Sequence, residues 1–217
     1  MRLYKFIDSK WGTEAILRRR LKASIISGLN DPFEGRCVRI KTRAERTAWS
    51  KALERMDLKH GLISFSKKWS NPVLWLHYAD NHRGMALGFD IAGDVQVSEV
   101  TYQDELIDFD EIWAAPKDDR WKVAKRVFTT KFKHWEYEDE ARAFCDLNER
   151  DTVSGHYFLN FGTDLALKEI IFGAKFNGDA PWVRKCVADI EELGFTTARL
   201  AFQTFSIVKQ NDQRKQF

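Results

Sequence analysis

The sequence has few cysteines and no long hydrophobic run. Cys37, Cys145 and Cys186 lie far apart and form no C-x-x-C pair, so neither a disulfide framework nor a zinc site is predicted. No run approaches the roughly 18 apolar residues that a membrane span needs, and the opening MRLYKFIDSKWG lacks the apolar region of a signal peptide. We therefore expect a cytoplasmic protein without a membrane partner.

An excess of charge of one sign is also absent. The 35 basic and 32 acidic residues leave a formal charge of +3, unlike the strongly basic surface of a dedicated nucleic-acid-binding protein. The phosphate-loop patterns GxGxxG and GxxxxGK[ST] are missing, as is the GxSxG pattern of serine hydrolases. Composition and these patterns therefore identify no partner.

The chain does contain ample material for a core. It has 217 residues, of which 44% are hydrophobic, with 16 Phe and 8 Trp, a composition typical of a globular protein. Thr42 and Glu45 form a capping box before a helix reaching Met56, and Asn71 with Pro72 marks the start of another. These signals predict local structure at fixed positions.

Strands and helices are predicted to interleave without a regular βαβ repeat. We expect one α+β domain over residues 1–217, with a mixed or antiparallel sheet and flanking helices. The strands are expected at 3–7, 61–66, 84–91, 95–102, 156–161, 168–173 and 198–208, and the helices over about 13–22, 42–56, 71–78, 118–130 and 179–190.

The stretch KHWEYEDEARAF, residues 133–144, has four acids within five positions. As a strand it places Glu138, Glu140 and Arg142 on one face; as a helix it pairs Glu138 with Arg142 at i,i+4. Periodicity leaves both open. Desolvated, mutually repelling carboxylates favour a raised pKa suited to acid–base chemistry, whereas pairing of Glu140 with Arg142 favours a structural role.

Three other groups of residues were considered as sites. His77 and His82 are spaced by five, which turns them to different helix faces, so no metal site is predicted. Ser64 and Ser66 lack the setting of a triad nucleophile. The segment 30–34, NDPFE, predicts a tight loop in which Asp31 accepts backbone N–H groups and Phe33 is buried.

Several motifs in order resemble the bacterial domain of unknown function 2971 family. They are LYKF at 3–6, LNDPFE at 29–34, LWLHYADNHRGMALGFD at 74–90 and KHWEYEDEAR at 133–142, with IIFG at 170–173. The resemblance covers most of the chain. It implies a fold more than an activity.

The same order is similar to the ADP-ribosyltransferase layout, which implies a catalytic E-x-E pair at Glu138 and Glu140 and a strand at 133–144. If these glutamates stabilise a developing positive charge, Glu140→Gln is expected to remove the negative charge and to preserve the fold. Cofactor NAD is implied, although Lys5 replaces the usual Arg or His and SFS replaces STS. The implied NAD-binding residues are Tyr4, Lys5, Ser64 and Ser66, with Trp75 or Tyr78 stacking on the nicotinamide.

The resemblance thus implies an NAD-dependent ADP-ribosyltransferase or NAD-cleaving effector, of the kind that acts as a toxin or in antiviral defence. Its partners are a small-molecule nucleotide and an acceptor, which is a protein, a nucleic acid or water. One alternative is a non-catalytic nucleotide-binding or regulatory module. Another is a metal-dependent hydrolase that uses His77, His82 and a glutamate.

Overall fold

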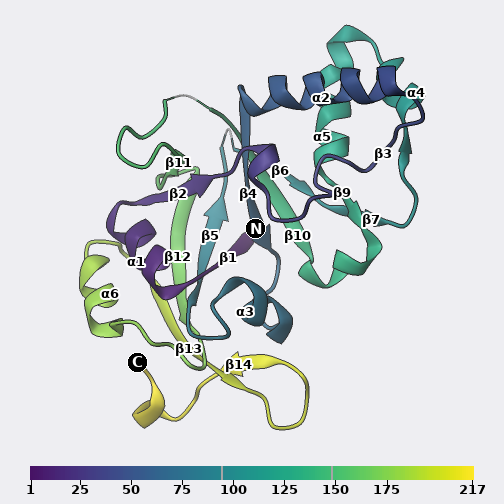
Figure 1. Ribbon diagram of the computed structural model, residues 1–217. Helices are drawn as coiled ribbons and strands as arrows, with labels where there is room; N and C mark the ends of the chain where they lie inside the picture. The colour runs from purple at the N-terminus through teal and green to yellow at the C-terminus, as the bar shows by residue number, and fades with distance from the viewer. Residues whose placement is uncertain (94, 148) are drawn as a thin grey trace.

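An eight-stranded sheet runs through the computed structural model, which describes residues 1–93, 95–147 and 149–217 (Figure 1). Only β12 and β13 pair in parallel among its strands, so the sheet is mixed and mostly antiparallel. The predicted α+β domain is confirmed. In sheet order the strands are β14 (Ile207–Lys209), β13 (Gly194–Leu200), β12 (Leu165–Phe172), β5 (Met85–Ile91), β1 (Arg2–Ile7), β4 (His60–Ser66), β10 (Glu140–Asp146) and β6 (Gln96–Glu99).

Helices and short ribbons surround this sheet. The α-helices are α1 (Ser9–Leu17), α2 (Arg43–Asp57), α3 (Pro72–Tyr78), α4 (Phe109–Trp113), α5 (Arg120–Phe128) and α6 (Ala180–Cys186). The 3-10 helices are η1 (Ile26–Gly28), η2 (Lys117–Asp119), η3 (Lys133–Glu138) and η4 (Gln213–Lys215). The two-stranded ribbons join β2 (Arg20–Ala23) to β11 (Tyr157–Asn160), β3 (Val38–Arg39) to β8 (Ile107–Asp108), and β7 (Thr101–Gln103) to β9 (Thr130–Phe132). No helix among the described residues is both long and apolar enough to span a membrane.

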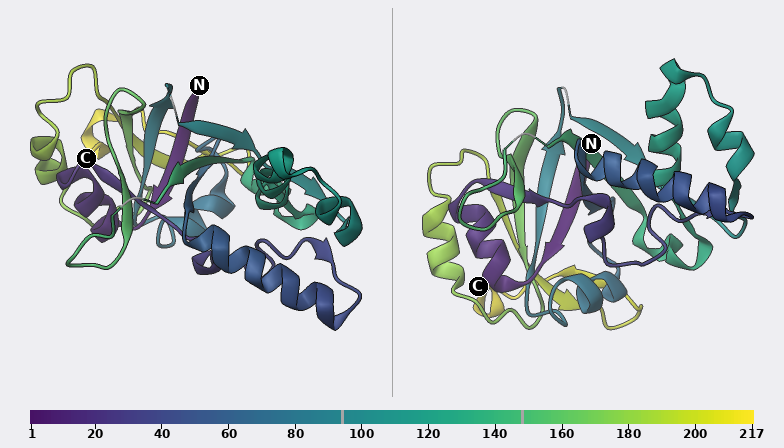
Figure 2. Two further views of the ribbon diagram at one scale, coloured as in Figure 1. Left: turned by 90° about the horizontal axis from the view of Figure 1, so that it is seen from above. Right: turned by 45° about the horizontal axis from the view of Figure 1, so that its top comes forward.

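Helices cover both faces of the sheet (Figures 1 and 2). On one face α1, α6 and the β2/β11 ribbon bury residues such as Ile16, Leu21 and Val183 against the strands. On the other face, α3 packs on β1 and β5, while α2, α4 and α5 enclose a separate apolar cluster against β4 and β10. The polar side chains of the candidate site lie on this second face, between its two apolar clusters.

Local capping starts the helices where the sequence predicts. Thr42 and Glu45 form the reciprocal capping box of α2, which satisfies backbone donors that have no partner within the helix. The Asn71 side chain accepts the Val73 N–H at 2.9 Å, and Pro72 occupies the first turn of α3. Both predictions are confirmed, and the second one places Tyr78 at the end of α3.

The sheet opens between its two central strands. β1 and β4 share the single register pair Tyr4–Ser66, whereas β1 and β5 share six pairs and β4 and β10 share seven. Lys5 bridges the opening, since its Nζ donates to the Ser64 carbonyl oxygen at 3.2 Å. Where two strands separate, backbone groups lose the partners that a continuous ladder of hydrogen bonds would give them. The Ser64 carbonyl oxygen is one such group, and it accepts from Lys5 instead.

Four sequence-based expectations are wrong in detail. The single strand expected over 198–208 is divided between β13 and β14, which are separated by residues 201–206. The helix expected over 13–22 ends at Leu17, because Arg19 adopts a left-handed φ of 52° and β2 follows. The strand expected over 133–144 begins only at Glu140, after the 3-10 helix. Phe33 is 69% exposed instead of buried, although Asp31 does accept the Phe33 N–H at 2.9 Å, as predicted.

Candidate functional site

Strand register places three of the predicted residues in one row across the sheet. Ser66 on β4 lies opposite Tyr4 on β1 and opposite Glu140 on β10. Directly paired residues project from the same face of a sheet, and Ser64 lies opposite Arg142 on that face. Side chains far apart in the sequence therefore meet where the sheet opens.

Glu138 reaches the same place by a different route. It is the last residue of the 3-10 helix, and Asp139 follows with a left-handed φ of 44° before β10 begins. This reversal turns both Glu138 and Glu140 inward, and each is only 4% exposed. The two glutamates do not lie on one strand, yet they line one cavity.

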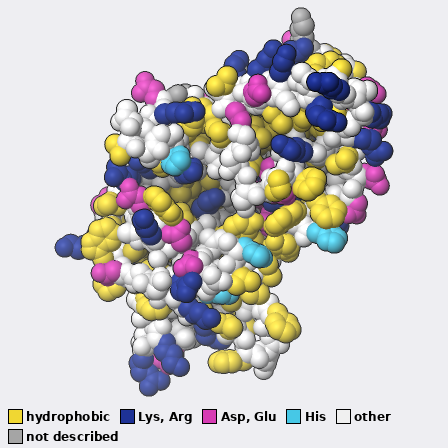
Figure 3. Space-filling model, viewed as in Figure 1, with side chains coloured by type: hydrophobic (Ala, Val, Ile, Leu, Met, Phe, Trp, Pro, Cys, Tyr) yellow, Lys and Arg dark blue, Asp and Glu magenta, His cyan; other side chains and the backbone are white. Residues whose placement is uncertain are grey.

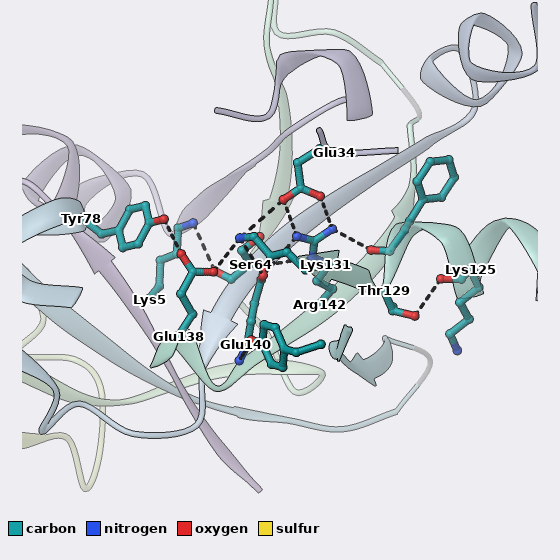
Figure 4. A network of polar contacts seen from close by, with 12 residues as sticks. Lys5, Glu34, Ser64, Tyr78, Lys125, Thr129, Lys131, Glu138, Glu140 and Arg142 are labelled. Atoms are coloured by element: carbon teal, nitrogen blue, oxygen red, sulfur yellow. Dashed lines mark hydrogen bonds and ion pairs between the residues drawn. The ribbon is translucent and has the colours of Figure 1, made fainter. Parts of the chain in front are cut away.

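Arg142 is saturated with hydrogen bonds (Figure 4). Its Nη1 and Nη2 donate to Glu34 at 2.8 and 2.6 Å, and its Nε and Nη2 donate to Glu140 at 2.8 and 3.1 Å. Nη1 also donates to the Phe128 carbonyl oxygen at 2.6 Å. A guanidinium has five N–H donors, and these five bonds use the full set. Glu140 is therefore fixed by a buried, bidentate ion pair.

Lys131 and Tyr78 hold the other glutamate. Lys131 Nζ lies 2.6 Å from Glu138 Oε2, 3.4 Å from Glu140 Oε2 and 3.6 Å from Glu34 Oε1. The Tyr78 hydroxyl donates to Glu138 Oε1. Figure 4 shows these contacts running from Tyr78 through Glu138 to Lys131 and on to Glu34. The cluster thus combines three carboxylates with two cations in a buried setting.

The two glutamates differ in acidity. Burial raises the pKa of Glu138, and Lys131 and Tyr78 oppose that shift only in part. Burial acts on Glu140 too, but the Arg142 guanidinium, together with Lys131 and Ser64, outweighs it and holds the pKa of Glu140 well below its usual range. Carboxyls whose pKa values are pushed apart can take different roles in one reaction. Glu140 stays ionised, whereas Glu138 is suited to exchanging a proton.

The cavity at the opening has a volume of about 120 Å³. Seven of the eight residues singled out from the sequence line it, namely Tyr4, Lys5, Ser64, Ser66, Tyr78, Glu138 and Glu140. Burial lowers the pKa of the Lys5 amine, whose Nζ makes a single hydrogen bond. The sequence therefore identified most of the lining.

Trp75 is the exception, because it is a core residue and does not line the cavity. Its side chain is fully buried. Its indole N–H donates to the Trp69 carbonyl oxygen at 2.6 Å, and its ring meets Phe6 edge-on at a centroid distance of 5.2 Å. With its ring covered and its donor used, Trp75 has no surface with which to stack on a ligand. Of the two aromatic residues suggested for stacking, only Tyr78 lines the cavity.

Ser64, Ser66 and Tyr4 also form hydrogen bonds within the protein. Ser66 Oγ donates to the Lys68 carbonyl oxygen at 3.0 Å and accepts the Lys68 N–H at 3.3 Å, so it closes the turn after β4. The Tyr4 hydroxyl lies 3.4 Å from Glu169 Oε2. Ser64 contributes its carbonyl oxygen to Lys5. These bonds fix the shape of the cavity wall.

Sequence reasoning missed the cation at the centre of the cluster. Lys131 follows α5 on the short strand β9, and its neighbours give no pattern that marks it. From the sequence, Glu34 was assigned no role beyond its place in NDPFE, and Arg142 only that of a partner of Glu140. The NDPFE motif does carry a signal for Glu34, because the tight loop around Asp31 directs it to Arg142.

No metal centre emerges within residues 1–93, 95–147 and 149–217, where no group of three or more His, Cys, Asp or Glu is placed to hold an ion. The His82 ring stacks near Trp75 at 6.3 Å, whereas His77 lies 6.4 Å from the Tyr137 ring. The two histidines thus have different surroundings.

A wider cleft of about 550 Å³ adjoins the cavity and shares Lys5, Phe6, Ser24 and Tyr78 with it. Figure 3 shows a hollow near the centre of this face, bordered by basic and hydrophobic side chains. The combined space reaches the size range of small-molecule sites, roughly 300–1,000 Å³. Comparison of the chain with protein-family models, curated proteins and solved structures gave no match.

Proposed function

We propose that the protein binds NAD or a related nucleotide at this cavity and cleaves the bond between nicotinamide and ribose. The ADP-ribose passes to an acceptor group or to water. The opened sheet beside β1 and the paired glutamates at the start of β10 support the resemblance to the ADP-ribosyltransferase layout. The proposal rests chiefly on one observation, the placement of Glu138 and Glu140 in a shared cavity with different partners, Glu140 on Arg142 and Glu138 on Tyr78 and Lys131. The opposite directions of their pKa shifts agree with these partners.

The two shifts match the two electrostatic needs of this reaction. The electron pair of the broken bond leaves with the nicotinamide nitrogen, so positive charge develops on the ribose. An ionised Glu140, fixed in place by Arg142, stabilises that charge without reorganising. The oxygen of the attacking hydroxyl group bonds to the anomeric carbon, and the ionised Glu138 carboxylate accepts the proton of that hydroxyl group.

The surrounding residues fit a nucleotide of this kind. Tyr78 and Lys131 orient the Glu138 carboxylate from both sides, through Oε1 and Oε2. Lys5 brings an ammonium group with one hydrogen bond to the cavity wall, which suits an anionic substrate. The 120 Å³ cavity holds only the reacting part of NAD, and the rest requires the 550 Å³ cleft beside it.

The test is release of nicotinamide from NAD by the purified protein and by Glu138→Gln. We expect the variant to lose about 10²–10⁴-fold in rate, the usual contribution of a general base. Glu138 is also the buried partner of Lys131, so the variant is expected to melt at a lower temperature, and the rates are compared at a temperature at which both proteins are folded. Glu136→Gln is the matched control, because Glu136 is exposed and, among the described residues, forms its one salt bridge with Lys133. Acceptors to include are water, proteins and nucleic acids.

Two outcomes contradict the proposal in different ways. Absence of release by the wild type with every acceptor removes the enzymatic function. Release that survives in Glu138→Gln shows that the base is a different carboxylate. Glu34 is then the residue to substitute, and the control Glu136→Gln already tests the other remaining candidate.

A non-catalytic nucleotide-binding module is the second candidate, and a specific observation favours it. Both oxygens of Glu140 are engaged by Arg142, and Lys131 also approaches Oε2, so much of its charge is neutralised within the protein. Such a network stabilises a fold as readily as a transition state. Wild-type protein that binds ADP-ribose but releases no nicotinamide from NAD identifies the module.

A further inference from the structure

The β2/β11 ribbon has two faces of opposite character. Its register pairs Lys22 with Phe158 and Leu21 with Leu159, and side chains alternate between faces along each strand. One face packs Leu21, Ala23, Tyr157 and Leu159 into the core. The other face contributes Arg20, Lys22, His156 and Phe158 to the wider cleft. Cationic and aromatic groups are thus gathered on one wall.

Arg20 is held in place on this wall but is far from saturated. Its guanidinium carbon lies 3.7 Å from the centroid of the Phe158 ring, and Nη1 donates to Asp151 at 2.8 Å. Nε is buried and has no hydrogen-bond partner in the part of the chain that the structure describes. Arg142, in contrast, uses all five of its donors. A guanidinium stacked on a ring and bonded by one edge is preorganised to bind an anion with its remaining donors.

The cleft carries a surplus of positive charge. Its three carboxylates are already committed, since Asp151 pairs with Arg20, Glu14 pairs with Arg18, and Asp8 caps α1 by accepting the Trp11 N–H at 2.9 Å. Within the described ranges, no ion pair involves Lys5 or Lys22. Lys5, Lys22 and Arg20 all line the cleft, and of these three only Arg20 has a carboxylate partner among the described residues.

We infer that Arg20 and Lys22 form a phosphate-binding subsite for the diphosphate of a nucleotide whose ribose enters the inner cavity. This inference rests on the proposed function for the direction in which the nucleotide lies. Lys5 lines both spaces and contacts the substrate between its phosphates and the reacting ribose. Trp11, which is 57% exposed at the rim of the cleft, offers a ring on which the base can stack.

The experiment is calorimetric titration with ADP-ribose, which carries the diphosphate but lacks the bond to be cleaved. Each of Arg20→Gln and Lys22→Gln is expected to weaken binding by at least about tenfold, as for loss of a charge-assisted hydrogen bond. Lys51→Gln, on the exposed side of α2, is the matched control and should bind as the wild type does. Adenosine, which has no phosphate, should bind all four proteins equally.

The outcomes separate this inference from the proposed function. Unchanged ADP-ribose affinity in both cleft variants, or no binding by the wild type, overturns the subsite. If both variants release nicotinamide with an unaltered KM for NAD, the subsite is also overturned, whereas the proposed function stands. Binding that depends on Arg20 and Lys22 without any release of nicotinamide supports the subsite and removes the function. If Arg20→Gln fails to fold, Lys22→Gln still tests the subsite, because the Lys22 side chain is exposed and its substitution should not disturb the fold.

Discussion

Arg142 and Glu140 lie two residues apart on β10 and meet side by side on one face of the sheet. Arg142 Nε is 2.8 Å from Glu140 Oε1, and Nη2 is 3.1 Å from Oε2. Both side chains are almost completely buried. Because a buried charge is costly without its partner, neither residue can be changed without affecting the other.

Glu140→Gln is therefore expected to destabilise the protein, contrary to the expectation that this substitution preserves the fold. Removal of one member of a buried ion pair costs about 3–5 kcal/mol. Arg142 keeps Glu34 as a partner, which places the expected loss at the lower end of that range. Urea denaturation measures it as a decrease in the midpoint.

Glu136→Gln is the control for this measurement. Its salt bridge to Lys133 is exposed, and exposed pairs contribute about 0–1 kcal/mol. Equal midpoints for Glu140→Gln and Glu136→Gln would show that the Arg142 pair contributes little to folding.

Asp31→Ala is expected to cost about 1 kcal/mol, the typical loss for a side-chain cap. Asp31 Oδ1 accepts the Phe33 N–H, and the Asp31 carbonyl oxygen accepts the Glu34 N–H at 3.0 Å. The loop thereby sets the position from which Glu34 reaches Arg142. Thermal denaturation checks the loss.

Phe33→Ala tests whether the stability of the NDPFE loop depends on the Phe33 side chain or only on the hydrogen bonds made by Asp31. Phe33 is exposed, so its truncation should change the free energy of unfolding by less than about 0.5 kcal/mol. A larger loss for Phe33→Ala than for Asp31→Ala would mean that the side chain packs in a way the structure does not show.

The sequence predictions that depend on local signals were the most accurate. The capping box at Thr42 and the Asn71–Pro72 pair act within one helical turn, so neighbouring residues suffice to predict them. The left-handed Asp139 has no such signal, because glycine is the residue that marks this conformation. Periodicity left strand and helix open for this stretch, and the strand that the resemblance implied ran through Asp139 and missed the 3-10 helix before it.

The candidate site depended on contacts that local patterns do not encode. Arg142 and Glu34 are separated by 108 positions and meet only because the NDPFE loop folds over β10. Lys131 joins the cluster from β9, which pairs with β7 outside the main sheet. The resemblance found Glu138, Glu140 and the serines by motif order. It could not identify the cations that set their acidity.

Lys131→Met is expected to make stability strongly dependent on pH. Lys131 opposes the burial that raises the pKa of Glu138, so its removal raises that pKa further. A carboxyl with a raised folded-state pKa binds its proton more tightly in the folded state. Its contribution to stability is present below the ordinary value of 4.5 and is lost as pH rises through the folded value.

Urea midpoints at pH 5 and pH 8 test this sign. The difference between wild type and Lys131→Met should be larger at pH 8, where the folded variant must hold an ionised Glu138 without its nearest cation. A variant that is equally destabilised at both pH values would indicate lost packing instead of lost charge compensation.

Tyr78→Phe tests the link between Glu138 and catalysis through the pH dependence of nicotinamide release. The Tyr78 hydroxyl donates to Glu138 and favours its ionised form, which lowers the pKa of that carboxyl against the effect of burial. Without the donor the pKa of Glu138 rises. A base acts only when it is deprotonated, so the acid limb of the rate profile should move to higher pH.

Tyr137→Phe is the control, since none of the described hydrogen bonds involves its hydroxyl, although burial and nearby Glu138 raise its own pKa. It should leave the acid limb where the wild type has it. Melting temperatures of both variants exclude a loss of fold as the cause. An unshifted limb in Tyr78→Phe would mean that the group titrating in the rate profile is not Glu138. The assignment of the base would then be wrong even if NAD is cleaved, because a hydrogen bond to the titrating carboxylate cannot be removed without changing its proton affinity.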